Sequence, residues 1–150
     1  MRLTDVLIET GVVHAGMTLA DAFRECVIHN VPGVPFCDAQ DKVVGRVSVR
    51  HSLKMTCIPE YVVKGAHMLG DLLEGVAIRD EQIRSVLELP VEPFVLKNIA
   101  AVGPAAPIVK ALSVMEHYNS SYILVLEGEC YLGIVTRLGI ARLMLRSRGD

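Results

Sequence analysis

Residues 18–48 read TLADAFRECVIHNVPGVPFCDAQDKVVGRVS, and the same plan returns at residues 107–136, PIVKALSVMEHYNSSYILVLEGECYLGIVT. In the first copy, apolar residues at three- and four-residue spacing predict a helix up to residue 30, capped by Thr18. Pro32 and Gly33 end that helix, and two apolar runs around a polar turn predict a β-hairpin. The second copy predicts the same helix and hairpin, followed by a closing helix over 137–145.

The two copies align with an almost constant offset. Asn30 and Asn119 lie 89 positions apart, whereas Ser48 and Thr136 lie 88 apart. The one-residue change falls in the hairpin turn, where deletions are tolerated. An extended segment precedes each first helix, so each unit reads strand, helix, strand, strand, helix. Because one unit alone exposes an apolar sheet face, we expect two units to pack against each other.

A stretch without a counterpart separates the two copies. We therefore divide the chain into a first unit at 1–54, a helical insert at 55–90 and a second unit at 91–150. Within the insert, one helix is predicted over 59–73 and another over 80–88. Asp80 is expected to cap the second of these helices, and its inward face is predicted to hold Ile83, Val86 and Leu87.

Composition excludes several classes of protein. The 150 residues are 51% hydrophobic and 21% charged, which excludes disorder, and a net charge of -2 argues against nucleic-acid binding. No window has the roughly 18 uncharged apolar residues that a membrane span needs. The first residues lack the plan of a signal peptide, so we expect a cytoplasmic protein. Four unpaired cysteines predict buried thiols and no metal site.

The order, spacing and duplication of these pieces resemble the cystathionine-β-synthase (CBS) domain pair. The resemblance implies an α/β fold with α+β layering: two tandem β-α-β-β-α units packed sheet to sheet about a pseudo-twofold axis. It also implies clefts between the units that bind AMP, ADP, ATP or S-adenosylmethionine, and a regulatory rather than catalytic role. The matching pieces are 3–6 (LTDV), 17–22 (MTLADA), 30–38 (NVPGVPFCD), 44–48 (VGRVS), 91–94 (VEPF), 119–125 (NSSYILV) and 132–136 (LGIVT).

The family motif that faces the ligand ends in Gly-apolar-apolar-Thr/Ser-x-x-Asp, and this chain keeps only part of it. Ser48 and Thr136 supply the hydroxyls, at the start of helices whose free N–H groups suit a phosphate. The aspartate that would hold the ribose is replaced by His51 and Gly139. Losing such a charge-assisted contact costs about 1.5–3 kcal/mol, so nucleotide binding is expected to be weakened.

Other candidate residues have two interpretations each. Arg50 and Arg137 could reach a phosphate from the helix start, or could be solvated first-turn residues. Ser48 and Thr136 could be simple N-caps. A further set of apolar residues is expected in the core, and these residues could also line an adenine pocket. This set is Val13, Val34, Pro35, Val102, Ile123 and Leu124.

Two functional hypotheses remain, since no catalytic constellation is present and an enzyme is not expected. The first is a regulatory module that binds an adenosine-containing ligand between its units and transmits a conformational change to an effector protein. The second is a pair that has lost nucleotide binding and serves as an interaction or dimerisation module, with the apolar insert as its contact surface. A homodimer is expected in both cases. The helix faces proposed for it carry Phe23, Val27, Leu138, Ile140, Ala141, Leu143 and Met144.

Overall fold

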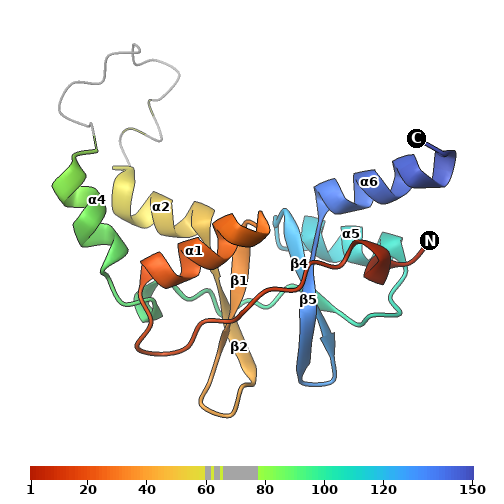
Figure 1. Ribbon diagram of the computed structural model, residues 1–150, viewed down its shortest axis with the longest axis horizontal. Helices are drawn as coiled ribbons and strands as arrows, with labels where there is room; N and C mark the ends of the chain where they lie inside the picture. Colours follow the sequence, from red (N-terminus) through yellow and green to blue (C-terminus); the bar gives the residue numbers. More distant parts are fainter. Residues whose placement is uncertain (60–61, 63–64, 66–77) are drawn as a thin grey trace.

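The duplication appears in the computed structural model as two hairpins that lie side by side, with their turns at the same end (Figure 1). The structure describes residues 1–59, 62, 65 and 78–150. The first unit contains α1 (Leu19–His29), β1 (Gly33–Cys37), β2 (Val43–Ser48) and α2 (Val49–Cys57). The second contains β3 (Ala101–Val102), α5 (Ile108–His117), β4 (Tyr122–Glu127), β5 (Cys130–Thr136) and α6 (Arg137–Arg148).

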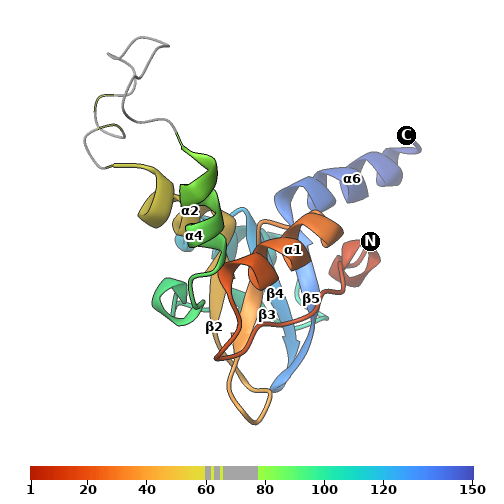
Figure 2. The same cartoon turned by 60° about the vertical axis from the view of Figure 1, so that its left-hand side comes forward.

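Three short helices surround these units. They are the 3-10 helices η1 (Leu3–Val6) and η3 (Glu92–Phe94), and α4 (Asp80–Leu87), which packs against α1 (Figure 2). The prediction that Asp80 caps α4 is wrong, because the helix starts one residue earlier than expected. Arg79 is the N-cap residue, with an extended backbone, and its side chain makes no cap hydrogen bond. Val86 is buried, but Ile83 is 43% exposed. The helix expected over 59–73 falls largely outside the described residues.

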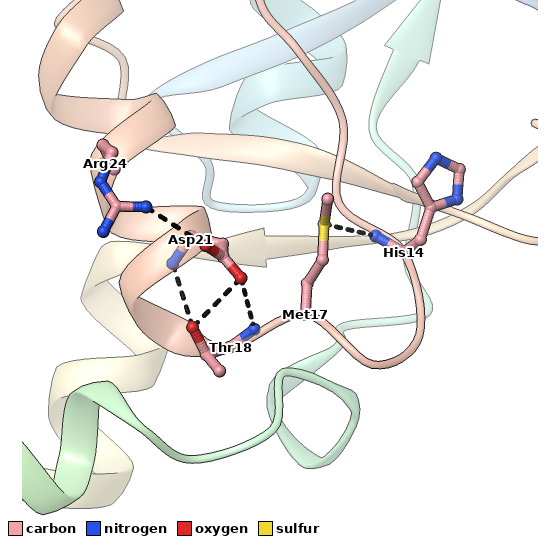
Figure 3. Close-up of polar contacts among 5 residues, drawn as sticks. All are labelled: His14, Met17, Thr18, Asp21 and Arg24. Carbon is pink, nitrogen blue, oxygen red and sulfur yellow. Dashed lines mark hydrogen bonds and ion pairs between the residues drawn. The ribbon is translucent and has the colours of Figure 1, made fainter.

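The start of α1 follows the sequence prediction in detail (Figure 3). The Thr18 hydroxyl accepts a hydrogen bond from the Asp21 N–H at 3.3 Å, and the Asp21 carboxylate accepts one from the Thr18 N–H at 2.9 Å. This reciprocal capping box satisfies two helix-end donors at once. The Thr18 N–H lowers the pKa of Asp21, because it stabilises the charged carboxylate. The Arg24 guanidinium also contacts Asp21, at 3.2 Å.

Each unit builds a small sheet of the same design. In the second unit β3 runs parallel to β4, which pairs antiparallel with β5. In the first unit β1 and β2 are antiparallel, and Val13 supplies a single parallel bridge to Phe36 where the second unit has β3. Side chains from both sheets share one hydrophobic cluster, which includes Val34 and Val47 with Leu124 and Ile134. The expected sheet-to-sheet packing is therefore confirmed.

The segments that lead into the two units cross over to the opposite unit. These lead segments are residues 3–8 and 91–96. Leu96 exchanges two backbone hydrogen bonds with Arg46 on β2, at 2.9 and 2.8 Å, and Ile8 does the same with Ile134 on β5, both at 2.8 Å. This exchange was not foreseen, and it ties each unit to the start of the other.

Two glycines make the crossing possible. A Cβ added at Gly45 would lie 2.9 Å from the Leu96 carbonyl oxygen, and one at Gly133 would lie 2.6 Å from that of Ile8. Real Cβ atoms essentially never approach backbone that closely. The glycine of each Gly-x-x-Ser/Thr sequence is therefore needed because another backbone segment crosses at that point.

The cysteines follow the prediction only in part. Cys26 and Cys37 are buried in the core of the first unit, and Cys57 is half-buried. Cys130 was wrongly placed among the buried thiols: it is exposed, because it stands at the tip of the β4–β5 hairpin.

Candidate functional site

A cleft of about 440 Å³ opens between the two units, where the end of β2 faces the start of β4. It draws on β2, α2 and the α1–β1 loop of the first unit, on the end of the second lead segment and Asn98 after it, and on the α5–β4 loop, β4 and α6 of the second unit. The lining residues are Pro32, Arg46, Ser48, Arg50, His51, Lys54, Leu96, Asn98, Tyr118, Asn119, Ser120, Ser121, Tyr122 and Arg137.

The first unit contributes the N-terminal turn of α2. Ser48 is the N-cap of this helix, and its hydroxyl accepts a hydrogen bond from the His51 N–H at 3.0 Å. Arg50 and His51 follow in the first turn, and Lys54 stands one turn later. The predicted capping role of Ser48 is thus confirmed, and three residues expected at a ligand site are brought together.

The second unit contributes the loop between α5 and β4 together with the start of α6. Asn119 has a positive φ of 50° and turns the chain from the helix into the strand. The Ser120 hydroxyl donates to the Tyr122 carbonyl oxygen at 2.8 Å, which holds the loop against the strand. Arg137 lines the cleft from across the unit boundary, and its guanidinium lies 3.0 Å from the Glu116 carboxylate.

Arg46 is the lining residue that the sequence analysis missed. It belongs to β2 and is only 6% exposed. Its guanidinium donates to the Asn98 carbonyl oxygen at 3.1 Å, to the Asn98 side chain at 3.4 Å and to the Tyr122 hydroxyl at 2.8 Å. It also lies 5.3 Å from the centre of the Tyr122 ring. The available signal was an arginine inside an otherwise apolar strand, where the second copy has Ile134.

The charged side chains that line the cleft are all cationic. Four cationic side chains line it, and His51 adds an imidazole, whereas no aspartate or glutamate is among the lining residues. Burial raises the pKa of the Tyr122 hydroxyl, and the neighbouring Arg46 opposes that rise. Among the residues that the structure describes, no group of three His, Cys, Asp or Glu side chains could hold a metal ion. The arrangement therefore favours an anionic ligand.

The remaining predicted site residues lie elsewhere. Thr136 caps α6 by accepting a hydrogen bond from the Gly139 N–H at 2.9 Å, and it is not among the cleft residues. The six apolar candidates are buried in the cores of the two units, and none of them lines this cleft. Contact between these six residues and a ligand stays a prediction.

Comparison with known proteins agrees with the fold. Residues 91–146 match the CBS domain family model. No curated protein sequence matches the chain. Residues 91–146 are thus a CBS domain, and the chain as a whole has the fold of a tandem CBS-domain pair.

Solved structures of low sequence identity share this fold along nearly the whole chain. A CBS domain-containing protein of unknown function from Bacillus anthracis is 21% identical, with a TM-score of 0.66 and coverage of 97% of this chain and 94% of that one. A putative acetoin utilization protein (AcuB) from Vibrio cholerae is 17% identical, with a TM-score of 0.67 and coverage of 99% and 93%.

A third structure shares the fold and contains ligands. It is the CBS domain pair of protein MJ0100 in complex with 5′-methylthioadenosine and S-adenosyl-L-methionine. It is 18% identical, with a TM-score of 0.66 and coverage of 98% of both chains.

Proteins with a CBS pair are generally regulatory rather than catalytic. No helix in the described part of this chain is long and apolar enough to cross a membrane.

Proposed function

We propose that this chain is a regulatory module that binds an adenosine-containing ligand in the cleft between its two units. One observation carries the proposal: Ser48, Arg50, His51 and Arg137, chosen from the sequence alone, line one cleft together. Three of them stand at the start of α2 and one at the start of α6, so both units contribute. A ligand held there contacts both units at once and changes the geometry between them, and this change is the signal to an effector protein.

The missing aspartate sets the expected strength of binding. His51 stands at its position in the first unit and offers at most one acceptor, whereas a carboxylate accepts from both ribose hydroxyls. In the second unit Gly139 has no side chain, and its N–H is already bonded to Thr136. We therefore expect the ribose to be held weakly, and the anionic part of AMP, ADP or ATP to supply most of the affinity through the cationic lining.

A thermal-shift series with AMP, ADP, ATP and S-adenosylmethionine tests the proposal. A ligand at a hundred times its dissociation constant stabilises the folded state by about 2.7 kcal/mol, which raises Tm by about 5–10 °C for a chain of this size. Arg50→Gln is expected to weaken binding about tenfold, because it removes one cation from the cleft. Arg142→Gln is the matched control: it removes an exposed cation that does not line the cleft. The absence of a shift with every ligand would contradict the proposal.

A second candidate function, an interaction module that forms a homodimer, is supported by apolar residues on the outer helix faces. Val27 on α1 is 78% exposed, and Leu138 and Met144 on α6 are 69% and 61% exposed. α6 extends away from both sheets (Figure 1), which leaves that face accessible. The prediction that Ile140 and Leu143 belong to this surface is wrong. Both residues are buried, because they face η1 and the core of the second unit.

Light scattering of the purified chain tests the dimer. We expect twice the chain mass at micromolar concentration, and the mass of a single chain for the double variant Leu138→Asp, Met144→Asp. A matched double variant, Val109→Asp, Leu112→Asp, changes two exposed apolar residues on α5 and is expected to leave the dimer intact. A monomeric wild-type chain would contradict this candidate.

A further inference from the structure

The fold itself does not require a cation at residue 46. Arg46 and Ile134 lie 88 positions apart and occupy the same place in the two units, since each exchanges two backbone hydrogen bonds with the crossing lead segment. Ile134 is completely buried and completes the core there without any charge. The same strand position is thus built equally well with an aliphatic side chain. The presence of arginine in the first unit needs an explanation other than packing.

The neighbours of Arg46 accept hydrogen bonds from only some of its guanidinium N–H groups. Three of its five N–H groups donate to Asn98 and Tyr122, which are neutral partners. No carboxylate stands among the residues that line the cleft. A guanidinium removed from water without an anion is costly, and that cost is recovered when an anion binds beside it. The remaining N–H groups belong to a side chain that lines an open cavity, where an incoming group can reach it.

We propose that Arg46 is the anion anchor of the cleft and binds a phosphate or polyphosphate group of the ligand. The proposal rests on the proposed function and deepens it, because it selects phosphorylated compounds over neutral adenosine and over cationic S-adenosylmethionine. The guanidinium fork matches two phosphate oxygens at once, which a lysine cannot do. Arg50, Lys54 and Arg137 surround the anion from the rim of the cleft.

Calorimetric titration of the wild-type chain with AMP, adenosine and inorganic pyrophosphate gives the first test. We expect AMP to bind about 10- to 100-fold more tightly than adenosine, which corresponds to one charge-assisted contact of the usual strength. Pyrophosphate alone is expected to bind and to compete with AMP. Equal affinities for AMP and adenosine would overturn the anchor while leaving the proposed function intact. Binding of pyrophosphate without any contribution from adenosine would support the anchor and refute the adenosine part of the proposed function.

Variants assign the effect to Arg46. Arg46→Met is expected to abolish the preference for AMP over adenosine, and Arg46→Lys to keep only part of it, because lysine has charge without the fork. Arg142→Met is the matched control, since it removes an exposed arginine on α6 that does not line the cleft. It is expected to bind AMP within threefold of the wild type. A loss of AMP binding in Arg142→Met as large as in Arg46→Met would show that the loss does not come from a cation in the cleft, and would overturn the proposal.

A spectroscopic measurement keeps the test independent of whether Arg46→Met folds. The Nε–H of a buried, hydrogen-bonded arginine gives a resolved NMR signal, which Arg46→Lys identifies by its absence. We expect saturating AMP and saturating pyrophosphate to shift this signal, and adenosine to leave it in place. An unchanged Arg46 signal in the presence of bound AMP would overturn the proposal.

Discussion

Gly45→Ala is expected to detach the second lead segment from β2. The new methyl group would meet the Val95 side chain and would lie 2.9 Å from the Leu96 carbonyl oxygen, which is backbone and cannot rotate away. The two hydrogen bonds between Arg46 and Leu96 would then lengthen or break. Because Leu96 and Asn98 line the cleft, the damage would reach the ligand site as well.

The size of the effect of Gly45→Ala follows from those contacts. Two backbone hydrogen bonds contribute about 1–3 kcal/mol, and overpacking costs a similar amount when the neighbours must move. Alanine recovers about 0.5–1 kcal/mol from its smaller backbone entropy loss. Allowing for non-additivity, we expect the free energy of unfolding to fall by about 1–3 kcal/mol, which lowers Tm by about 2–12 °C.

Denaturant unfolding and thermal melts of four proteins provide the assay: the wild type, Gly45→Ala, Gly133→Ala and Gly103→Ala. The new Cβ of Gly133→Ala would lie 2.6 Å from the Ile8 carbonyl oxygen, so this variant is expected to be equally destabilised. Gly103→Ala is the control, because a Cβ added there would lie 3.9 Å from its nearest neighbour, the Leu126 carbonyl oxygen. Only Gly45→Ala is expected to weaken ligand binding. If Gly45→Ala and Gly133→Ala both melted within 1 °C of Gly103→Ala, the crossing of the lead segments would be refuted.

Three further predictions concern the helix cap and the thiols. Thr18→Ala removes the capping hydroxyl of α1 and is expected to cost about 1 kcal/mol in urea unfolding, whereas an unchanged midpoint would contradict the cap. Since the pKa of Asp21 is lowered in the folded state, its contribution is present above its unfolded value near 3.8 and is lost as the pH falls through the lower folded value. Asp21→Asn should therefore be less stable than the wild type at pH 7, and the gap should narrow in unfolding curves as the pH falls below 3.8. Cys130 is exposed, whereas burial raises the pKa of Cys26 to about 11, so a thiol reagent at pH 8 is expected to label Cys130 and to spare Cys26 until the chain unfolds, as mass spectrometry of digests would show.

The units and their elements were readable from the sequence because their determinants are local. The spacing of apolar residues places α1 and α5, and the polar turn between apolar runs places each hairpin. Thr18 and Ser48 were recognised as caps because a cap bonds to a residue three positions away in the same helix. Asn30 and Asn119 end their helices in the left-handed region, with φ of 53° and 50°, and their matched positions were visible in the alignment of the two copies.

The candidate site was predictable only where its residues belong to the repeated motif. Ser48, Arg50, His51 and Arg137 follow from the motif and the offset between the copies, and they do meet in one cleft. The loop residues 118–122 and Asn98 could not be chosen in this way, because they reach the cleft only through the packing of one unit on the other. Cys130 and Ile140 were misplaced for the same reason: exposure depends on which neighbours cover a residue.

The sequence by itself determined the repeat, the order of helices and strands and the motif residues at the starts of α2 and α6, since each of these depends on neighbours within a few positions along the chain. Only the tertiary structure decided that the lead segments cross to the opposite units, that Gly45 and Gly133 stand under them, and that Arg46 is buried facing the cleft. These features depend on contacts between residues about 50 to 125 positions apart, such as those of Arg46 with Asn98 and of Ile8 with Ile134. No local pattern carries that information, because it arises when two surfaces with matching shapes pack together.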